Sequence, residues 1–346
     1  MEQNIDINEY RKIFENVKKE VLKSQYRAVR AVNKELIYMY WHIGNLILEN
    51  AKWGNKFIDN LSVDLKLEFP KTTGFSVRNL KYMKKFALEY PDLEFVQEVL
   101  AQITWYHNVI LMDMIKEIEE RKWYINEIIK NGWSTNILKN YIKSKLYERQ
   151  AVAEKISNFE NTLPDAQSDL ALQTLKDPYL FGFISIKGKI REIEIENTMI
   201  DKIKDVLIEL GNGFAFVGNQ YKLTVGDKDY FIDLLFYHLQ LKCYIVVELK
   251  AREFEPADVG QLNFYLSAID DLVKGKNDNP SIGLLLCKNR DKFTAEYSLR
   301  DINKPIGVSE YKLLEDIPEY LQSQLPKAED IELHMQDIED LETDIY

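Results

Sequence analysis

The 346-residue sequence lacks the features that mark secreted, membrane and zinc-binding proteins. It has two cysteines, Cys243 and Cys287, which lie far apart inside apolar runs and are typical of core residues in a reduced protein. No apolar stretch is long enough to cross a membrane, and the N-terminus has neither the basic nor the apolar region of a signal peptide. These absences favour a soluble, cytoplasmic protein with no membrane partner.

The sequence also lacks a Walker A loop, a dinucleotide-binding fingerprint and the G-x-S-x-G elbow of serine hydrolases. Nor is it basic overall, because 45 Lys and Arg residues face 56 Asp and Glu residues, giving a net charge of -11. The charge is uneven: residues 1–150 hold 24 basic and 20 acidic residues, whereas residues 151–346 hold 21 and 36. Part of this acidity lies in residues 328–346, which we expect to be a solvated acidic tail.

What the first 150 residues do have is helical periodicity nearly throughout, with few glycines or prolines to interrupt it. This pattern predicts a helical domain over residues 1–160. One long helix or two are expected between residues 10 and 49. Further helices are predicted at residues 56–67, 76–89, 93–103, 109–119, 123–130 and 135–159.

One predicted helix of this domain has a basic face. Ser76 follows a glycine turn and is a candidate N-cap, and Arg78, Lys81, Lys84 and Lys85 recur on one side of the helix after it. Such a face can bind phosphates, as the second helix of a helix-turn-helix does. We therefore take Arg78, Lys81 and Lys85 as candidate DNA-binding residues, with an ordinary solvated face as the alternative.

The pattern changes after residue 160. Residues 161–190 contain prolines and glycines and are predicted to be a linker region, followed by an α/β domain over residues 191–327. Its helices are predicted at residues 192–210 and 256–273, and its strands at residues 214–217, 221–225, 230–237, 243–249, 281–287 and 307–313. The order predicts an α+β multidomain protein in which an all-α domain precedes an α/β domain with a mixed central sheet.

Two predicted strands of this domain carry charge inside apolar surroundings. Asp233 lies in FIDLLFY, and Glu248 and Lys250 lie in VVELK. If an even-numbered hairpin loop is centred on residues 240 and 241, Asp233 stands opposite Glu248, and Glu248 and Lys250 share one face of their strand. Ionised groups in such a sheet are costly unless they pair or hold a metal. A structural salt bridge is the alternative for any one of the three.

The chemistry that suits this set is metal-assisted hydrolysis. Two carboxylates suit Mg²⁺, which prefers a few hard oxygen ligands and can polarise a phosphodiester and activate water. Lys250 beside them can orient that water and help to deprotonate it.

The pattern of Asp233 followed by E-x-K on the next strand resembles the PD-(D/E)XK nuclease superfamily. The surrounding segments ELGNGFAFVGNQYKL, DYFIDLLFYHLQLKCYIVVELK, FEPADVGQLNFYLSAIDD and PSIGLLLCK resemble the YhcG-type bacterial nuclease family over residues 188–325. The N-terminal segments YWHIGNLI, GFSVRNLKYM and NGWSTNIL resemble that family's helical domain. One departure is Ile232, which stands where the superfamily has proline.

This resemblance implies a restriction-endonuclease-like core, a nuclease activity and DNA as the substrate. It also implies that the N-terminal helical domain, residues 1–160, binds DNA or a partner. It also implies accessory site residues: the carbonyl of Leu249 as a metal contact, Gln261 as a residue that positions water or phosphate, and Glu196 as a further acidic ligand. Glu209 competes with Glu196 for the last role, and Gln261 has a purely structural alternative.

The sequence therefore predicts an Mg²⁺-dependent DNA endonuclease, with Mn²⁺ as a possible substitute for Mg²⁺. Double-strand cleavage would favour a homodimer. Two alternatives stay open: a DNA- or partner-binding protein that no longer cleaves, and a subunit of a larger restriction, defence or recombination system that needs its partner for activity.

Overall fold

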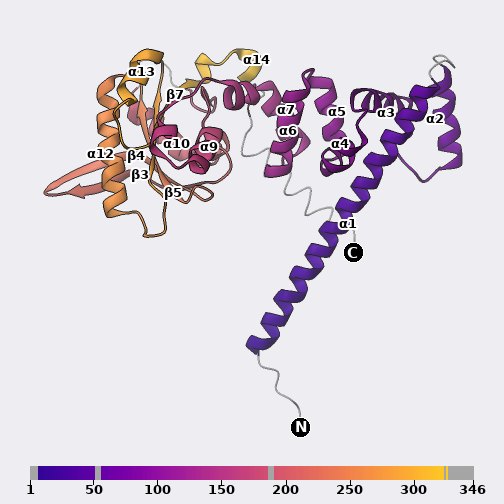
Figure 1. The fold of residues 1–346 in the computed structure, drawn as a ribbon, viewed down its shortest axis with the longest axis horizontal. Helices are drawn as coiled ribbons and strands as arrows, with labels where there is room; N and C mark the ends of the chain where they lie inside the picture. Colours follow the sequence, from indigo (N-terminus) through magenta and orange to yellow (C-terminus); the bar gives the residue numbers. More distant parts are fainter. Residues whose placement is uncertain (1–6, 51–55, 186–190, 323–324, 326–346) are drawn as a thin grey trace, which may run out of the picture. The chain divides into compact units, whose positions relative to one another are not determined.

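The computed structural model describes residues 7–50, 56–185, 191–322 and 325. The chain divides into two compact units, Met1–Leu138 and Lys139–Tyr346 (Figure 1). The predicted acidic tail, residues 328–346, lies outside the described residues. None of the helices in the described ranges has the length and apolar character needed to cross a membrane.

The first unit is helical, as predicted. Its elements are α1 (Ile7–Glu49), α2 (Lys56–Glu68), α3 (Val77–Glu89), α4 (Leu93–Glu98), the 3-10 turn η2 (Leu100–Gln102), α5 (Trp105–Met114) and α6 (Ile118–Asn131). The helix α7 (Thr135–Lys143) spans the boundary between the units.

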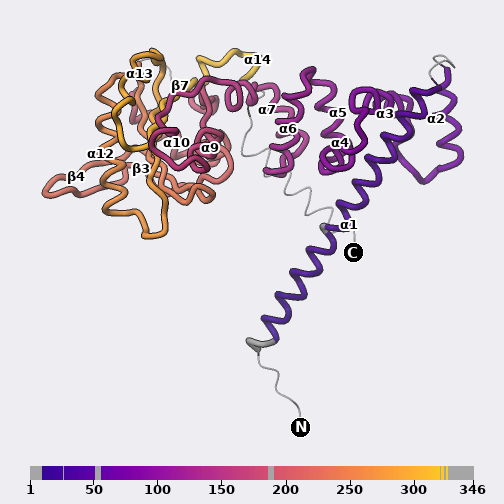
Figure 2. Tube along the Cα trace, in the orientation of Figure 1, coloured from indigo at the N-terminus to yellow at the C-terminus, as the bar shows by residue number. Residues whose placement is uncertain are grey.

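The sequence left open whether residues 10–49 form one helix or two. They belong to one long helix, α1. Its second half packs on α3 through a close approach at Gly44, where a Cβ atom would lie 2.1 Å from the carbonyl oxygen of Met83. Its first half extends beyond the other helices of the unit (Figure 1, Figure 2). Ser76 is the N-cap of α3, because its side chain accepts a hydrogen bond from the backbone N–H of Asn79 at 3.2 Å.

Some predicted helix bounds were wrong. The helix predicted at residues 109–119 begins earlier, at Trp105, because Thr104 caps it by accepting from the backbone N–H of His107. The helix predicted at residues 135–159 ends at Lys143. A π-helical turn (Glu148–Val152, η3) and the short strand β1 (Ile156–Ser157) follow it.

The second unit is built on a seven-stranded sheet. Its further elements are α8 (Phe159–Thr162), α9 (Asp165–Thr174), β2 (Tyr179–Phe181), α10 (Glu192–Asp201), α11 (Ile203–Leu210), β3 (Phe214–Val225), β4 (Lys228–His238), β5 (Cys243–Lys250), α12 (Pro256–Leu272), β6 (Ile282–Cys287), α13 (Lys292–Leu299), β7 (Ile306–Leu313), η4 (Leu314–Asp316) and α14 (Glu319–Gln322).

The sheet is mixed, which confirms the predicted fold class. The strand order is β1-β7-β6-β5-β4-β3, with β2 paired to β7. Strand β4 runs antiparallel to both β3 and β5, whereas β5, β6 and β7 run parallel to one another. The two strands predicted at residues 214–217 and 221–225 are one strand with an irregularity near Val217, and the helix predicted at residues 192–210 is broken at Lys202.

Part of the segment predicted as a linker folds into this unit. Within residues 161–190, α9 and β2 are regular elements, and Tyr179 and Phe181 of β2 are fully buried. Residues 186–190 lie outside the described residues. The domain boundaries proposed at residues 160 and 191 stay predictions.

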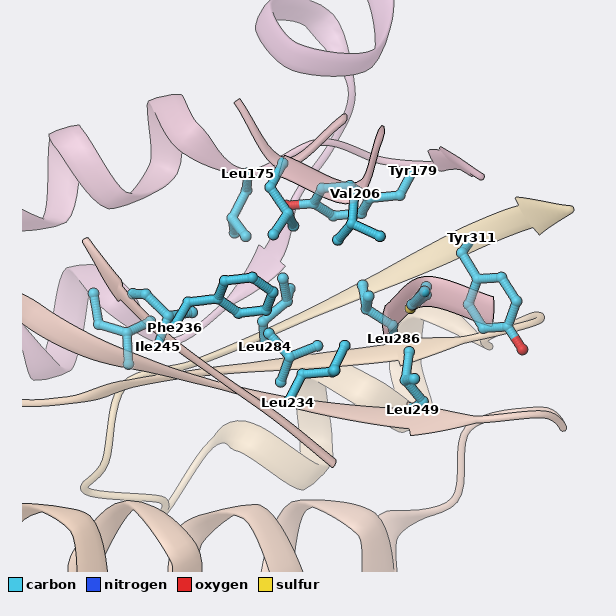
Figure 3. Close-up of a cluster of buried hydrophobic side chains, with 14 of the residues drawn as sticks. Leu175, Tyr179, Val206, Leu234, Phe236, Ile245, Leu249, Leu284, Leu286 and Tyr311 are labelled. Atoms are coloured by element: carbon cyan, nitrogen blue, oxygen red, sulfur yellow. The ribbon is translucent and has the colours of Figure 1, made fainter. Parts of the chain in front are cut away.

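Apolar side chains cover both faces of the sheet. On one face, residues of β4, β5 and β6 pack against β2, α9, α10 and α11, and Figure 3 shows members of this cluster such as Leu234, Leu249 and Tyr311. On the other face, Val246 and Leu285 pack against α12 and α13. Because Glu248 and Lys250 alternate with Val247 and Leu249, they project toward the α12 side.

Candidate active site

The hairpin of β4 and β5 has the predicted register. The ladder pairs His238 with Cys243 at the loop and ends where Leu234 pairs with Val247. Continuing this register by one residue places Asp233 opposite Glu248. The loop between the strands spans four residues, so the even-numbered loop expected from the sequence is confirmed.

Beyond the last ladder pair, side chains replace backbone groups as partners between the strands. The Asp233 carboxylate accepts a hydrogen bond from the backbone N–H of Leu249 at 2.9 Å. The Glu248 carboxylate accepts from the backbone N–H of Asp233 at 3.4 Å. The two acidic side chains therefore meet at the point where β4 and β5 part.

Helix α12 supplies the next contacts. Its Gln261 donates from Nε2 to the Glu248 carboxylate at 3.2 Å and to the Tyr265 hydroxyl at 3.1 Å. Lys250 Nζ lies 3.5 Å from both Glu248 Oε2 and Gln261 Oε1. Pro256 begins the helix, and Asp258 accepts from the backbone N–H of Glu255, so the first turn of α12 is fixed just before these residues.

Helix α10 and strand β3 approach the same acids from another direction. Gln220 Nε2 donates to Glu196 Oε2 at 2.7 Å and lies 3.4 Å from Asp233 Oδ1, so its amide links these two carboxylates. Gln220 has a φ of 43°, in the left-handed region that few residues other than glycine occupy. Such backbone strain is found mostly at functional sites.

Burial disfavours ionisation of all three acids when no cation is present. It raises the pKa of Glu248 to about 8, with the charge of Asp233 as the second cause. Burial also raises the pKa of Asp233, against the hydrogen bond from Leu249, and it raises the pKa of Glu196, against the hydrogen bond from Gln220. The cations and hydrogen-bond donors of the protein therefore do not fully offset the negative charge of these carboxylates.

These residues fit a divalent cation. Glu196 Oε1 is buried and has no donor at hydrogen-bonding geometry within the described ranges, although the Asn219 side chain lies near enough to lower the pKa of Glu196. A cation would satisfy this oxygen and would offset the charge of Asp233 and Glu248. In the described part of the chain, however, no three His, Cys, Asp or Glu side chains already stand at ligand spacing around one point. Carbonyl oxygens and waters would have to complete the shell, as Mg²⁺ commonly requires.

The structure separates the two candidates for the additional acid. Glu209 lies in α11 and is held by an ion pair of 2.6 Å to Arg149 and a hydrogen bond of 2.9 Å from the backbone N–H of Leu180. These contacts give Glu209 a structural role. Glu196, linked through Gln220 to Asp233, is the acid that the structure brings to the site.

The basic face of α3 is only partly available. Lys85 forms ion pairs with Asp113 at 3.2 Å and with Glu89 at 3.8 Å. Arg78 lies over the ring of Tyr82, 5.6 Å from its centre, and both Arg78 and Lys81 are exposed. The role of these three residues in binding DNA stays a prediction.

Sequence reasoning did not predict two of the contacts that build the site. The link that Gln220 makes depends on its left-handed backbone, for which the sequence gives no signal. Glu192 of α10 accepts from the backbone N–H of Ala251 at 3.1 Å, directly after Lys250, and its charge helps to raise the pKa of Asp233. Its place follows from the packing of α10 on the sheet, which periodicity alone does not predict.

The fold of the second unit and the geometry of the site agree with a nuclease-like protein, and two family models match the chain. Residues 172–326 match the family model of the YhcG PDDEXK nuclease domain, and residues 16–149 match that of the DUF1016 N-terminal domain. These two matches confirm the resemblance of the chain to the YhcG-type nucleases. Nucleases of this fold generally use divalent metals.

Comparison with curated proteins gives a relative over most of the chain. The chain is 29% identical over 340 residues to "Putative nuclease YhcG" of Escherichia coli (strain K12), and the match covers 88% of this chain and 90% of that protein.

Two solved structures also match, a repair endonuclease from Pyrococcus abyssi (TM-score 0.27) and a complex of EndoMS with double-stranded DNA (TM-score 0.26). Each is 16% identical, and the matches cover 38% and 39% of this chain. The chain spans about half the length of these two proteins.

Proposed function

We propose that this protein is an Mg²⁺-dependent endonuclease that hydrolyses phosphodiester bonds in DNA. The observation that carries the proposal is the meeting of Asp233, Glu248 and Lys250 where β4 and β5 part. A merely structural ion pair would need only one acid beside Lys250. Here two buried acids adjoin each other, a third is linked to them by Gln220, and their pKa values are raised.

Asp233 and Glu248 are the proposed ligands, with the Leu249 carbonyl and Glu196 as further contacts. When bound, Mg²⁺ would polarise the phosphodiester, offset the charge that develops on it and activate a water molecule. The hydrogen bond from the Leu249 N–H holds the Asp233 carboxylate in place. Because Gln261 contacts both Glu248 and Lys250, it fixes their spacing.

Lys250 is proposed to orient the attacking water. Lys250 is 7% exposed, and its ammonium group reaches both Glu248 and Gln261, so its position is set by two partners. A cationic group there also attracts the phosphate oxygens of the substrate. DNA would be held in addition by the exposed Arg78 and Lys81 of α3 and, to a lesser degree, by Lys85, whose charge Asp113 already offsets.

The test is a cleavage assay on linear duplex, branched and single-stranded DNA in Mg²⁺, in Mn²⁺ and in EDTA. Wild type should cleave at least one substrate with either metal and none in EDTA. Asp233→Ala should lose cleavage, whereas Asp227→Ala, at an exposed turn between β3 and β4, should keep it. DNA binding by wild type without cleavage of any substrate would reject the proposal and favour a non-cleaving subunit.

A further inference from the structure

Helix α1 has two apolar faces. One face contains Ile37, Tyr40 and Ile47, which are buried in the first unit. The other face runs along the whole helix at intervals of three, four or seven residues, and we call it the α1 stripe. The α1 stripe consists of Tyr10, Phe14, Val17, Val21, Ala28, Val32, Met39 and Leu46. It extends for about 54 Å at the rise of an α-helix.

Between residues 10 and 32, no described residue covers this stripe. The side chains of residues 10–25 and 27–32 are all exposed, and the large apolar ones among them are 50 to 70% exposed. Figure 2 shows this half of α1 extending beyond the helices with which its second half packs. The last two members of the stripe, Met39 and Leu46, line an apolar cavity of about 580 Å³ between α1 and α2. Because isolated helices are marginal in water, an apolar stripe of this length indicates a partner.

The charge beside the stripe selects the kind of partner. Residues 10–34 contain eight Lys and Arg residues but only Glu15 and Glu20 as acids. A second copy of α1 laid along the stripe would bring two basic helices together, which is unfavourable. An acidic segment with its own apolar face would instead bury the stripe and offset the charge.

The chain itself carries such a segment. Residues 328–346 contain eight acidic and no basic residues. Their apolar side chains recur at the spacing of one helical face, at Ile331, Met335, Ile338, Leu341 and Ile345. The segment from Ile331 to Ile345 would match about four turns of α1, or about 21 Å.

We propose that residues 328–346 dock on the α1 stripe, so that the acidic end is an interaction segment and not a solvated tail. Burial of about ten apolar side chains would remove on the order of 500 to 1,000 Å² from water. An interface of that area is small for a stable complex of two separate proteins. It is sufficient for stable docking when one chain supplies both segments. The pairing can form within one chain or between two copies.

Disulfide trapping in the full-length chain tests the proposal. The variant Val21→Cys/Ile338→Cys places one thiol on each segment, and the natural cysteines, Cys243 and Cys287, are buried. Under mild oxidation its disulfide should form at least tenfold faster than that of the control Leu67→Cys/Ile338→Cys. Leu67 is also exposed, but it lies in α2, outside the α1 stripe. The mass of the product shows whether the pairing is within or between chains. Equal rates for the two variants would overturn the proposal.

Charge exchange separates specific docking from random collision. Adding Lys18→Glu, Lys19→Glu and Lys23→Glu should slow trapping about tenfold at low ionic strength. Adding Glu332→Lys, Glu339→Lys and Asp340→Lys as well should restore the rate. The matched changes Lys56→Glu, Lys66→Glu and Lys71→Glu in and after α2 should leave it unchanged.

Other occupants of the stripe give different results. If Val21→Cys alone formed disulfide dimers as fast as the double variant, a second α1 would cover the stripe and the proposal would be wrong. Loss of trapping on addition of anionic phospholipid vesicles, with the protein sedimenting with them, would assign the stripe to a membrane surface and would also overturn it.

Discussion

The carboxylate cluster should make the cation-free protein less stable as the pH rises, and Glu248→Gln should remove most of this effect. Burial raises the pKa of Glu248 from 4.5 to about 8. Below pH 4.5, Glu248 keeps its proton in both the folded and the unfolded chain. Between the two values the unfolded chain releases it while the folded chain retains it, so stability falls as the pH rises toward 8.

The size of the loss follows from the same two values. A shift of this size corresponds to about 4 to 5 kcal/mol, or a decrease in Tm on the order of 10 °C for a protein unit of this length. The raised pKa of Asp233 contributes in the same direction. Because Glu248→Gln also alters the contact with Lys250, the informative quantity is the change in Tm between pH 5 and pH 8, and not the Tm at one pH.

Scanning calorimetry in EDTA measures this quantity for wild type, Glu248→Gln and the control Glu253→Gln, at an exposed position after β5. The Tm of wild type and of the control should decrease from pH 5 to pH 8, and the Tm of Glu248→Gln should decrease much less. Mg²⁺ should restore the Tm of wild type at pH 8. Identical pH profiles for wild type and Glu248→Gln would refute the reasoning about the buried acids.

Three other predictions concern single contacts in the two units. Gln220→Ala should lower stability in EDTA by about 1 kcal/mol, because it removes the donor between Glu196 and Asp233, and should strengthen Mg²⁺ binding in titration calorimetry. Glu209→Gln should cost about 3 kcal/mol by leaving buried Arg149 without its ion pair, yet leave Mg²⁺ affinity unchanged, whereas Glu196→Gln should weaken Mg²⁺ binding. Gly44→Ala should destabilise the helical unit in urea unfolding, because its Cβ would meet the Met83 carbonyl, and should not change Mg²⁺ binding.

The centre of the site could be predicted from the sequence because it depends on local rules. Alternation along a strand puts Glu248 and Lys250 on one side, and a four-residue hairpin loop aligns Asp233 with Glu248. The helix from Pro256 has a periodicity that places Gln261 and Tyr265 on one flank, and both contact the site. Each of these inferences spans fewer than 35 residues of chain.

The rest depends on contacts between distant segments. Glu196 and Glu209 lie in the same predicted helix, and only the break at Lys202 and the packing of each half separate their roles. Gln220 has a left-handed backbone, which its residue type does not predict. The burial of Tyr179 and Phe181 depends on pairing with β7, more than 100 residues later, which the local turn residues do not predict.

The most direct test of the proposed chemistry is the single-turnover cleavage rate of Lys250→Ala on DNA in Mg²⁺, with DNA binding measured alongside. The two carboxylate ligands remain in this variant, so we expect binding close to that of wild type and cleavage reduced at least a hundredfold. Cleavage at the wild-type rate would show that Lys250 does not serve the reaction and would contradict the proposed active site.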